Sequence, residues 1–223
     1  NSFLQSKEGI DIYSYTGWNG LSVTKFVISK DKSLSSSFIY SCFPELAAKG
    51  KIFVVNKGHI KFESSNQEVS LKDYDALDLA SNEKNYKLNS IDSTTIFMIS
   101  AIGLSNFNEK TIFFNFKKDI EARNLWGGQI ISRPYEGKGL TLVLFDLKPG
   151  FKFEDKGHAN EQITWLVSGK MDFYANGKNK TLTSDIGVDI GPNHIHGGVS
   201  GGALGYDAFY PKREEIKYKK EEI

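Results

Sequence analysis

The feature that most constrains the fold is an internal repeat of 111 residues. Sliding the chain along itself by this distance, without gaps, aligns identical residues at separated places. They are Ile52 with Ile163, Gly58 with Gly169, Phe62 with Phe173, Leu71 with Leu182, Asp78 with Asp189 and Asn82 with Asn193. Such self-similarity predicts two related domains. We assign them to residues 1–110 and 111–223, and the polar passage from Ser105 to Asn124 connects the two halves.

Short β-rich runs separated by Gly, Asn, Asp and Ser clusters fill both halves. Examples are Leu21 to Ser29, Lys51 to Lys57, Thr141 to Leu147 and Leu204 to Pro211. This spacing is typical of an all-β barrel or sandwich. In the first half only Pro44 to Gly50 favours a helical turn.

Charge and composition set several partner classes aside. The 28 basic and 27 acidic residues nearly cancel, leaving a net charge of +1. This balance provides no field to attract nucleic acid or an anionic membrane. No apolar run approaches the ~20 residues that cross a bilayer, and no signal peptide is visible. The single cysteine, Cys42, fits a reducing compartment. We therefore expect a cytoplasmic protein that binds neither nucleic acid nor membrane.

Three of the four histidines lie in two short segments, Gly150 to Gly169 and Gly191 to Gly197. In an extended strand, residues two apart share a face, so Lys156, His158 and Gln162 point the same way. His196 arrives from another strand after a turn in which Asn193 tolerates a left-handed backbone. Two imidazoles and one amide oxygen suit a divalent first-row metal, and Fe, Mn, Ni, Co and Zn are all compatible.

The spacing of the first segment resembles the cupin superfamily motif G-(x)5-H-x-H-(x)3-[EQ]-(x)6-G. The motif positions are occupied by Gly150, Lys156, His158, Gln162 and Gly169. The second cupin motif is matched more loosely, with His196 at the histidine position. The resemblance implies two tandem cupin-type barrels of the double-stranded β-helix, or jelly-roll, kind, which is a bicupin. The segments HANEQI and FYPKREE are similar to the bicupin isomerase of bacilysin biosynthesis, which is metal-dependent.

Lys156 departs from the motif, which usually has a third histidine there. An ammonium group cannot bind a metal, and a neutral amine needs a lowered pKa. Three outcomes stay open: the metal is held by His158, Gln162 and His196 alone, His194 supplies the missing imidazole, or the metal is lost and the pocket binds an anion. Near a metal, Lys156 is a candidate acid, base or carboxylate-binding charge.

The first half lacks this chemistry. In the repeat register, Lys156, His158, Gln162 and His196 face residues that cannot build an imidazole-rich site: Glu45, Ala47, Lys51 and Asn85. In the last strand, one face carries Tyr206 and Tyr210 and the other Asp207. We place the tyrosines inward, as candidate proton-transfer residues, because Asp207 is costly to bury alone.

We therefore predict a degenerate first barrel and a second barrel with a divalent metal site. The function that fits best is a metal-dependent enzyme that acts on a small polar metabolite, and the resemblance favours isomerisation. An iron-dependent dioxygenase and a non-catalytic small-molecule-binding or sensor cupin are the alternatives. Because such barrels leave strand edges that a second subunit commonly covers, we expect a homodimer.

Overall fold

The computed structural model describes residues 2–17, 20–47, 49–80, 82–105, 109–175 and 177–213. The chain forms two compact units, Asn1–Ile120 and Glu121–Ile223. The division follows residue 120, where the sequence suggested residue 110. The charged end of the chain lies outside the described residues from position 214 onward.

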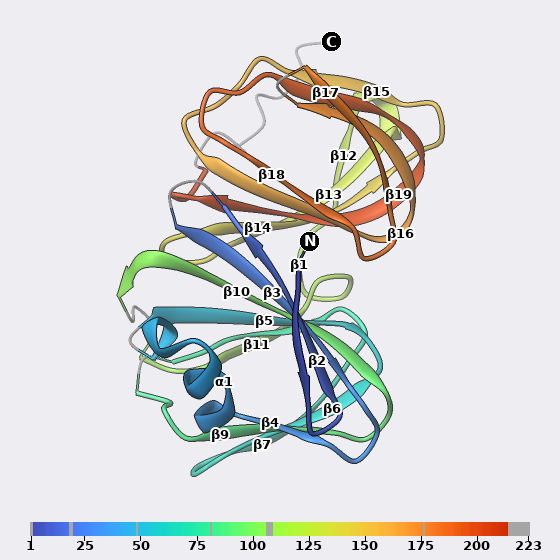
Figure 1. The fold of residues 1–223 in the computed structure, drawn as a ribbon. Coiled ribbons are helices and arrows are strands. Elements are labelled where there is room, and N and C mark those ends of the chain that lie inside the picture. Colours follow the sequence, from blue (N-terminus) through green and yellow to red (C-terminus); the bar gives the residue numbers. More distant parts are fainter. Residues whose placement is uncertain are drawn as a thin grey trace. The chain divides into compact units, whose positions relative to one another are not determined.

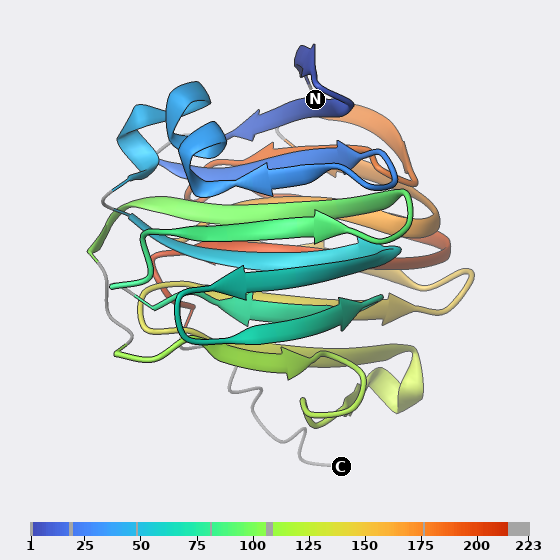
Figure 2. The same cartoon turned by 90° about the horizontal axis from the view of Figure 1, so that it is seen from below.

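The first unit is built from antiparallel strands (Figure 1, Figure 2). Its seven-stranded sheet has the order β1-β2-β3-β10-β5-β8-β11, and a four-stranded sheet has the order β4-β9-β6-β7. The strands are β1 Ser2–Lys7, β2 Ile10–Thr16, β3 Leu21–Ile28, β4 Ser33–Ser35, β5 Lys49–Lys57, β6 His59–Ser64, β7 Glu68–Lys72, β8 Asp75–Asp78, β9 Tyr86–Ser90, β10 Thr94–Ser105 and β11 Ile112–Asn115.

The second unit repeats this arrangement in one eight-stranded sheet. The order is β12-β13-β14-β19-β16-β17, while β15 pairs with β19 and β18 pairs with β16. The strands are β12 Arg123–Leu125, β13 Ile130–Glu136, β14 Thr141–Leu147, β15 Lys152–Asp155, β16 Glu161–Ala175, β17 Lys178–Thr183, β18 Gly187–Ile190 and β19 His196–Tyr210. A 3-10 turn, η2, spans Trp126–Gly128.

Strand pairing bears out the repeat. Ile52 of β5 faces Asp78 of β8, and Ile163 of β16 faces Asp189 of β18. Both members of the second pair lie 111 residues after their counterparts. The β6–β7 pairing reappears in β16–β17 with the same shift. Identical residues of the two halves therefore occupy equivalent positions in the strand pairing, and the all-β, duplicated fold is as predicted.

Two helical elements interrupt the first unit. The 3-10 turn η1, Pro44–Leu46, lies where a helical turn was expected. The helix α1, Ser36–Cys42, was not predicted, because its Ser, Phe, Ile and Tyr residues also suit a strand. Its start signal is Ser35, whose hydroxyl accepts a hydrogen bond from the Phe38 N–H at 3.1 Å. Among the described residues, no helix reaches the length and apolar character that a bilayer crossing requires.

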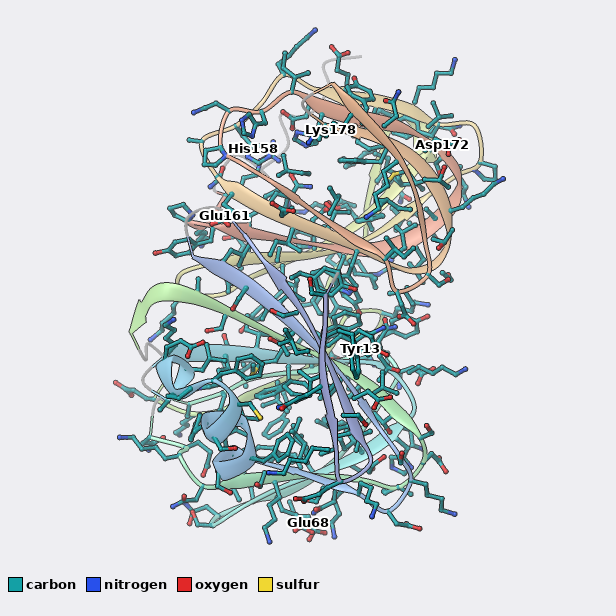
Figure 3. All side chains as sticks on the ribbon, in the orientation of Figure 1. Tyr13, Glu68, His158, Glu161, Asp172 and Lys178 are labelled. Carbon is teal, nitrogen blue, oxygen red and sulfur yellow. The ribbon has the colours of Figure 1, made fainter. Side chains whose placement is uncertain are left out.

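The interior of the first unit is packed with apolar side chains. Phe26, Phe53, Phe62 and Met98 are each at most 1% exposed and belong to one continuous cluster. Figure 3 shows side chains crowding the interior of this unit. Packing of this kind stabilises a barrel.

Candidate metal centre

The site begins where β15 ends, at a sharp turn around Gly157. The backbone of Gly157 has φ +101°, and a Cβ at this position would lie 2.8 Å from the carbonyl carbon of Asn193. The Asn193 N–H donates to the His158 carbonyl at 2.7 Å. Asn193 itself has φ +61°, the left-handed conformation expected for it. This close approach joins the two motif segments that sequence reasoning brought together.

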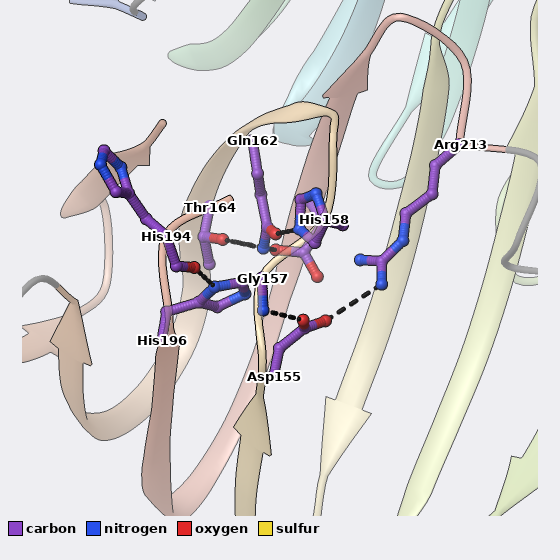
Figure 4. A network of polar contacts seen from close by, with 9 residues as sticks. Asp155, Gly157, His158, Gln162, Thr164, His194, His196 and Arg213 are labelled. Carbon is purple, nitrogen blue, oxygen red and sulfur yellow. Dashed lines mark hydrogen bonds and ion pairs between the residues drawn. The ribbon is translucent and has the colours of Figure 1, made fainter. Parts of the chain in front are cut away.

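Asp155, His158 and His196 form the cluster that results (Figure 4). One ligand atom from each side chain lies within 4.8 Å of the others. His158 is 7% exposed and His196 3% exposed, whereas Asp155 is half-buried. Two nitrogen donors and one carboxylate are a donor set suited to a divalent first-row metal.

Hydrogen bonds indicate which imidazole nitrogens carry a proton. His196 Nδ1 lies 2.9 Å from the His194 carbonyl, so Nδ1 carries the proton and Nε2 keeps its lone pair. His158 Nε2 lies 3.0 Å from Gln162 Oε1, and because that oxygen can only accept, Nε2 carries the proton. The buried Nδ1 of His158 has no hydrogen-bond partner among the described residues.

Gln162 lies at the centre of a second set of contacts. Its amide nitrogen donates to Thr164 Oγ1 and to Asp207 Oδ1, each at 2.9 Å. Thr164 also donates to Asp207 Oδ1, at 2.5 Å. With its amide oxygen engaged by His158, Gln162 orients that ring. Gln162 was predicted to be a metal ligand. To bind an ion through its amide oxygen, it would have to give up the hydrogen bond from His158.

Asp155 is the residue of this cluster that sequence reasoning missed. Its Oδ1 accepts from the Gly157 N–H at 2.9 Å, and its Oδ2 accepts from Arg213 at 3.0 Å. Burial by itself raises the pKa of Asp155, but the Arg213 and Gly157 hydrogen bonds outweigh it, so the pKa lies below its ordinary value. The carboxylate is thus held ionised, as a metal ligand must be.

The imidazole of His158 is held neutral. Burial lowers its pKa, and the nearby Arg213 charge acts in the same direction, against the hydrogen bond that His158 donates to Gln162. A neutral imidazole keeps the lone pair that metal binding needs.

Lys156 and His194 do not join the cluster through their side chains. The Lys156 side chain is 84% exposed and pairs with Glu154 at 2.5 Å, which raises the pKa of Lys156. The turn at Gly157 is the reason, because the chain is no longer extended from 156 to 160 and adjacent residues exchange sides. Figure 4 shows the His194 ring pointing away, so its carbonyl is the part that contacts His196.

The last strand presents the face opposite to the one predicted. Asp207 and Phe209 line the cavity, while Tyr206 stacks on Trp165 with ring centroids 5.3 Å apart. Neither Tyr206 nor Tyr210 lines the cavity. The expectation rested on the cost of burying Asp207 alone, but Thr164 and Gln162 both donate to it. Burial raises the pKa of Asp207, and these two hydrogen bonds oppose the shift.

A cavity of about 500 Å³ opens beside the cluster, within the second unit. Its polar end includes Asp155, Gln162, Thr164, His196 and Asp207. The size is ordinary for a small-molecule site. Among the described residues, the only group of three or more His, Cys, Asp or Glu side chains placed to hold a metal is the one at this end.

Comparison with known proteins places the fold but not the activity. No family model matches the chain, and no curated protein matches it. Solved structures do. AerE from Microcystis aeruginosa has a TM-score of 0.75 and 12% identity over 94% of this chain and 96% of its own. A cupin 2 conserved barrel domain protein from Leptotrichia buccalis has a TM-score of 0.63 and 15% identity, over 94% and 92%.

Bacillus subtilis oxalate decarboxylase, described with Mn(II) centres, is a third similar structure. Its TM-score is 0.69 and its identity 6%, over 94% of this chain and 75% of its own. At such identities the likeness shows the fold alone. The two barrels of this chain therefore have the fold seen in cupin proteins, and the second carries a candidate metal site.

Proposed function

We propose that the second barrel is a metal-dependent enzyme that moves a proton on a small-molecule substrate. The observation that carries the proposal is the convergence of Asp155, His158 and His196 beside a cavity that Asp155 and His196 line. A divalent ion bound there would polarise a carbonyl or hydroxyl oxygen of the substrate. Manganese in a protein of similar fold supports this choice of site.

Asp207 is the cavity residue best suited to move the proton. Burial raises the pKa of its carboxyl group, so the acid holds a proton closer to neutral pH than an exposed aspartate does. Gln162 and Thr164 fix its orientation. Lys156 is less suited to this role than Asp207, because the Lys156 amine is exposed and paired with Glu154. Isomerisation is a reaction of this type, and the similarity of the HANEQI segment to a bicupin isomerase agrees with it.

An iron-dependent oxygenase is the second candidate. The observation that favours it is Asp155, because two histidines and one carboxylate are the donor set of many non-haem iron oxygenases. Metal identity separates the two proposals. A redox-inactive metal at full occupancy in active protein would count against the oxygenase, whereas iron-dependent oxygen uptake would support it.

The ligand set is tested by metal affinity in matched variants. We expect His158→Ala, His196→Ala and Asp155→Ala each to weaken Mn²⁺ binding at least about 100-fold, and Gln162→Leu by about 10-fold, as for a residue that orients a ligand. His194→Ala is the control, because its ring points away and the backbone carbonyl persists. Metal-free protein whose stability none of these changes alters would point to a non-catalytic binding module.

A homodimer is a separate proposal. Strand β1 lies at the edge of the seven-stranded sheet, and Phe3 and Leu4 on it are 57% and 48% exposed. Exposed apolar strand edges are commonly covered by another subunit. Light scattering should give twice the monomer mass, and a Phe3→Lys, Leu4→Lys variant should give the monomer mass.

A further inference from the structure

The chain leaves β19 as a short strap, residues 211–213, which is tied to three other parts of the second unit. The contacts are the Asn160 amide donating to the Pro211 carbonyl at 2.7 Å, the Lys212 amine pairing with Glu136 of β13 at 2.9 Å, and the Arg213 N–H donating to Thr141 Oγ1 of β14 at 3.1 Å. None of these partners belongs to the metal cluster. The strap is therefore anchored independently of that cluster.

The side chain of Arg213 reaches from the strap to the cluster. Figure 4 shows its guanidinium group directed at Asp155, and Nη2 donates to Asp155 Oδ2 at 3.0 Å. The guanidinium carbon lies 5.0 Å from the ring centroid of Phe209. The side chains of Arg213 and Asp155 are 19% and 27% exposed. Water and salt therefore screen this ion pair less than they screen a pair at the surface.

The other charged groups that line the cavity are engaged elsewhere or exposed. Glu154 pairs with the Lys156 amine at 2.5 Å and accepts from the Tyr174 hydroxyl at 2.8 Å. Asp207 accepts the two hydrogen bonds from β16 described above. Lys152 is exposed on β15. Among the described residues, Arg213 is thus the cation whose side chain forms an ion pair with a member of the cluster.

Asp155 carries one negative charge, and Arg213 already neutralises it. A divalent ion at the cluster would add two positive charges beside the guanidinium group, while His158 and His196 bind metals as neutral ligands and offset none of that charge. Like charges in a partly shielded site repel strongly. Binding of the ion and pairing with Arg213 therefore oppose each other, and each must weaken the other by the same factor.

We propose that Arg213 competes with the metal ion for Asp155. The guanidinium group holds the carboxylate when no ion is bound and leaves it when an ion binds. Because the strap keeps its other anchors, the guanidinium group stays close enough to pair again when the ion departs. Arg213 is thus a positioning residue that acts through Asp155 and sets the affinity of the site. The competition rests on the metal site of the proposed function but not on the reaction.

Calorimetric titration of Mn²⁺ into the chelator-treated full chain tests the competition. We expect Arg213→Gln to bind Mn²⁺ about 10-fold more tightly than the wild type, within the usual range of coupling between two sites. Arg213→Lys keeps the charge and should stay near the wild type. Lys212→Gln, on the same strap, is the control and should change nothing. At about pH 7.5 an aspartate is ionised with or without a nearby arginine, so protonation of Asp155 does not contribute.

The accessibility of the guanidinium group gives a second readout. The chain has three arginines, so Arg123 and Arg133 serve as internal references for Arg213. Modification by phenylglyoxal, measured by mass spectrometry, should rise severalfold at Arg213 when Mn²⁺ is added and stay constant at the references. A His158→Ala, His196→Ala variant should show no response to Mn²⁺.

Each outcome decides the proposal. Equal Mn²⁺ affinity in the wild type and Arg213→Gln, or Arg213 modification that Mn²⁺ leaves unchanged, would overturn the competition and leave the metal site standing. Weaker binding in Arg213→Gln would also overturn it, since Arg213 would then orient Asp155 for the ion. Absence of Mn²⁺ binding in both proteins would remove the metal site together with the competition. Tighter binding in Arg213→Gln without any proton-transfer activity would sustain the competition and remove the proposed function.

Discussion

The two barrels share their strand pairing but direct different side chains into their interiors. The pairings place Phe53 of the first barrel at the position of Thr164, and Met98 at that of Asp207. They also place Tyr86 at the position of His196, and Ile12 at that of Ser132. All four residues of the second barrel line the cavity, whereas all four of the first belong to its core.

This difference teaches how one scaffold provides both a core and a site. At each of these positions the first barrel has a large side chain and the second a smaller, polar one, which lines the cavity of about 500 Å³. Three of the four residues of the second barrel, Thr164, His196 and Asp207, make hydrogen bonds through their side chains. A barrel that keeps the large residues gains packing energy and has no room to bind.

Exchanging the residues at one of these positions should have the largest effect. Met98→Asp should lower the free energy of unfolding by about 4 kcal/mol or more, because Met98 is fully buried among apolar side chains. Asp207→Met should change it by less than about 1.5 kcal/mol, since the side chain enters an existing cavity. Urea titrations of both variants measure this. Equal losses of unfolding free energy in the two variants would contradict the assignment of a packed core to the first barrel and a cavity to the second.

The second difference between the barrels is at Lys51, which lies 111 residues before Gln162 and aligns with it in the repeat. Lys51 is 3% exposed, its amine donates to the Lys49 carbonyl at 2.7 Å, and it lies 5.0 Å from the Tyr40 ring centroid. Burial, with a smaller effect from the Lys49 charge, lowers the pKa of Lys51 to about 8 from an ordinary 10.5. The folded state therefore binds this proton less tightly than the unfolded state does.

Stability should consequently rise with pH between about 8 and 10.5. Below this range Lys51 is charged in both states and its burial costs up to roughly 3 kcal/mol. Lys51→Met should raise the free energy of unfolding at pH 7 by as much as that amount and remove the rise at alkaline pH. Lys72→Met, at an exposed position, should keep the rise. Urea titrations from pH 7 to 11 make the comparison, and an unchanged slope for Lys51→Met would be contrary evidence.

A smaller effect is expected at Gly157. Gly157→Ala should lower the free energy of unfolding by about 2–3 kcal/mol, since the new Cβ meets the Asn193 backbone at a positive φ. Gly150→Ala, at φ +82° with nothing within 4 Å, should lose only about 1–2 kcal/mol. Thermal unfolding distinguishes them. Metal affinity should fall only in Gly157→Ala, and equal behaviour of the two variants would argue against the turn as the organiser of the site.

The sequence predicted the fold well, because repeated turns and strand positions are local signals. It also indicated His158 and His196. The sequence did not predict that Asp155 faces the cluster and Lys156 faces solvent. Which of these two adjacent residues faces inward depends on the turn at Gly157. Asp207 was misplaced because its partners, Thr164 and Gln162, come from another strand.

The repeat register was likewise limited. It aligned His196 with Asn85, whereas the strand pairing places Tyr86 at this position. The cause is that the two halves differ by one residue in length before this strand. A comparison without gaps cannot detect such a difference.

The most direct test of the account is the number of metal ions bound per chain. Protein dialysed against Mn²⁺ and analysed by mass spectrometry of the metal should contain one equivalent per chain, and a His158→Ala, His196→Ala variant should contain none. Two equivalents per chain, or one equivalent retained in that variant, would contradict the claim that the second barrel alone has become a metal site.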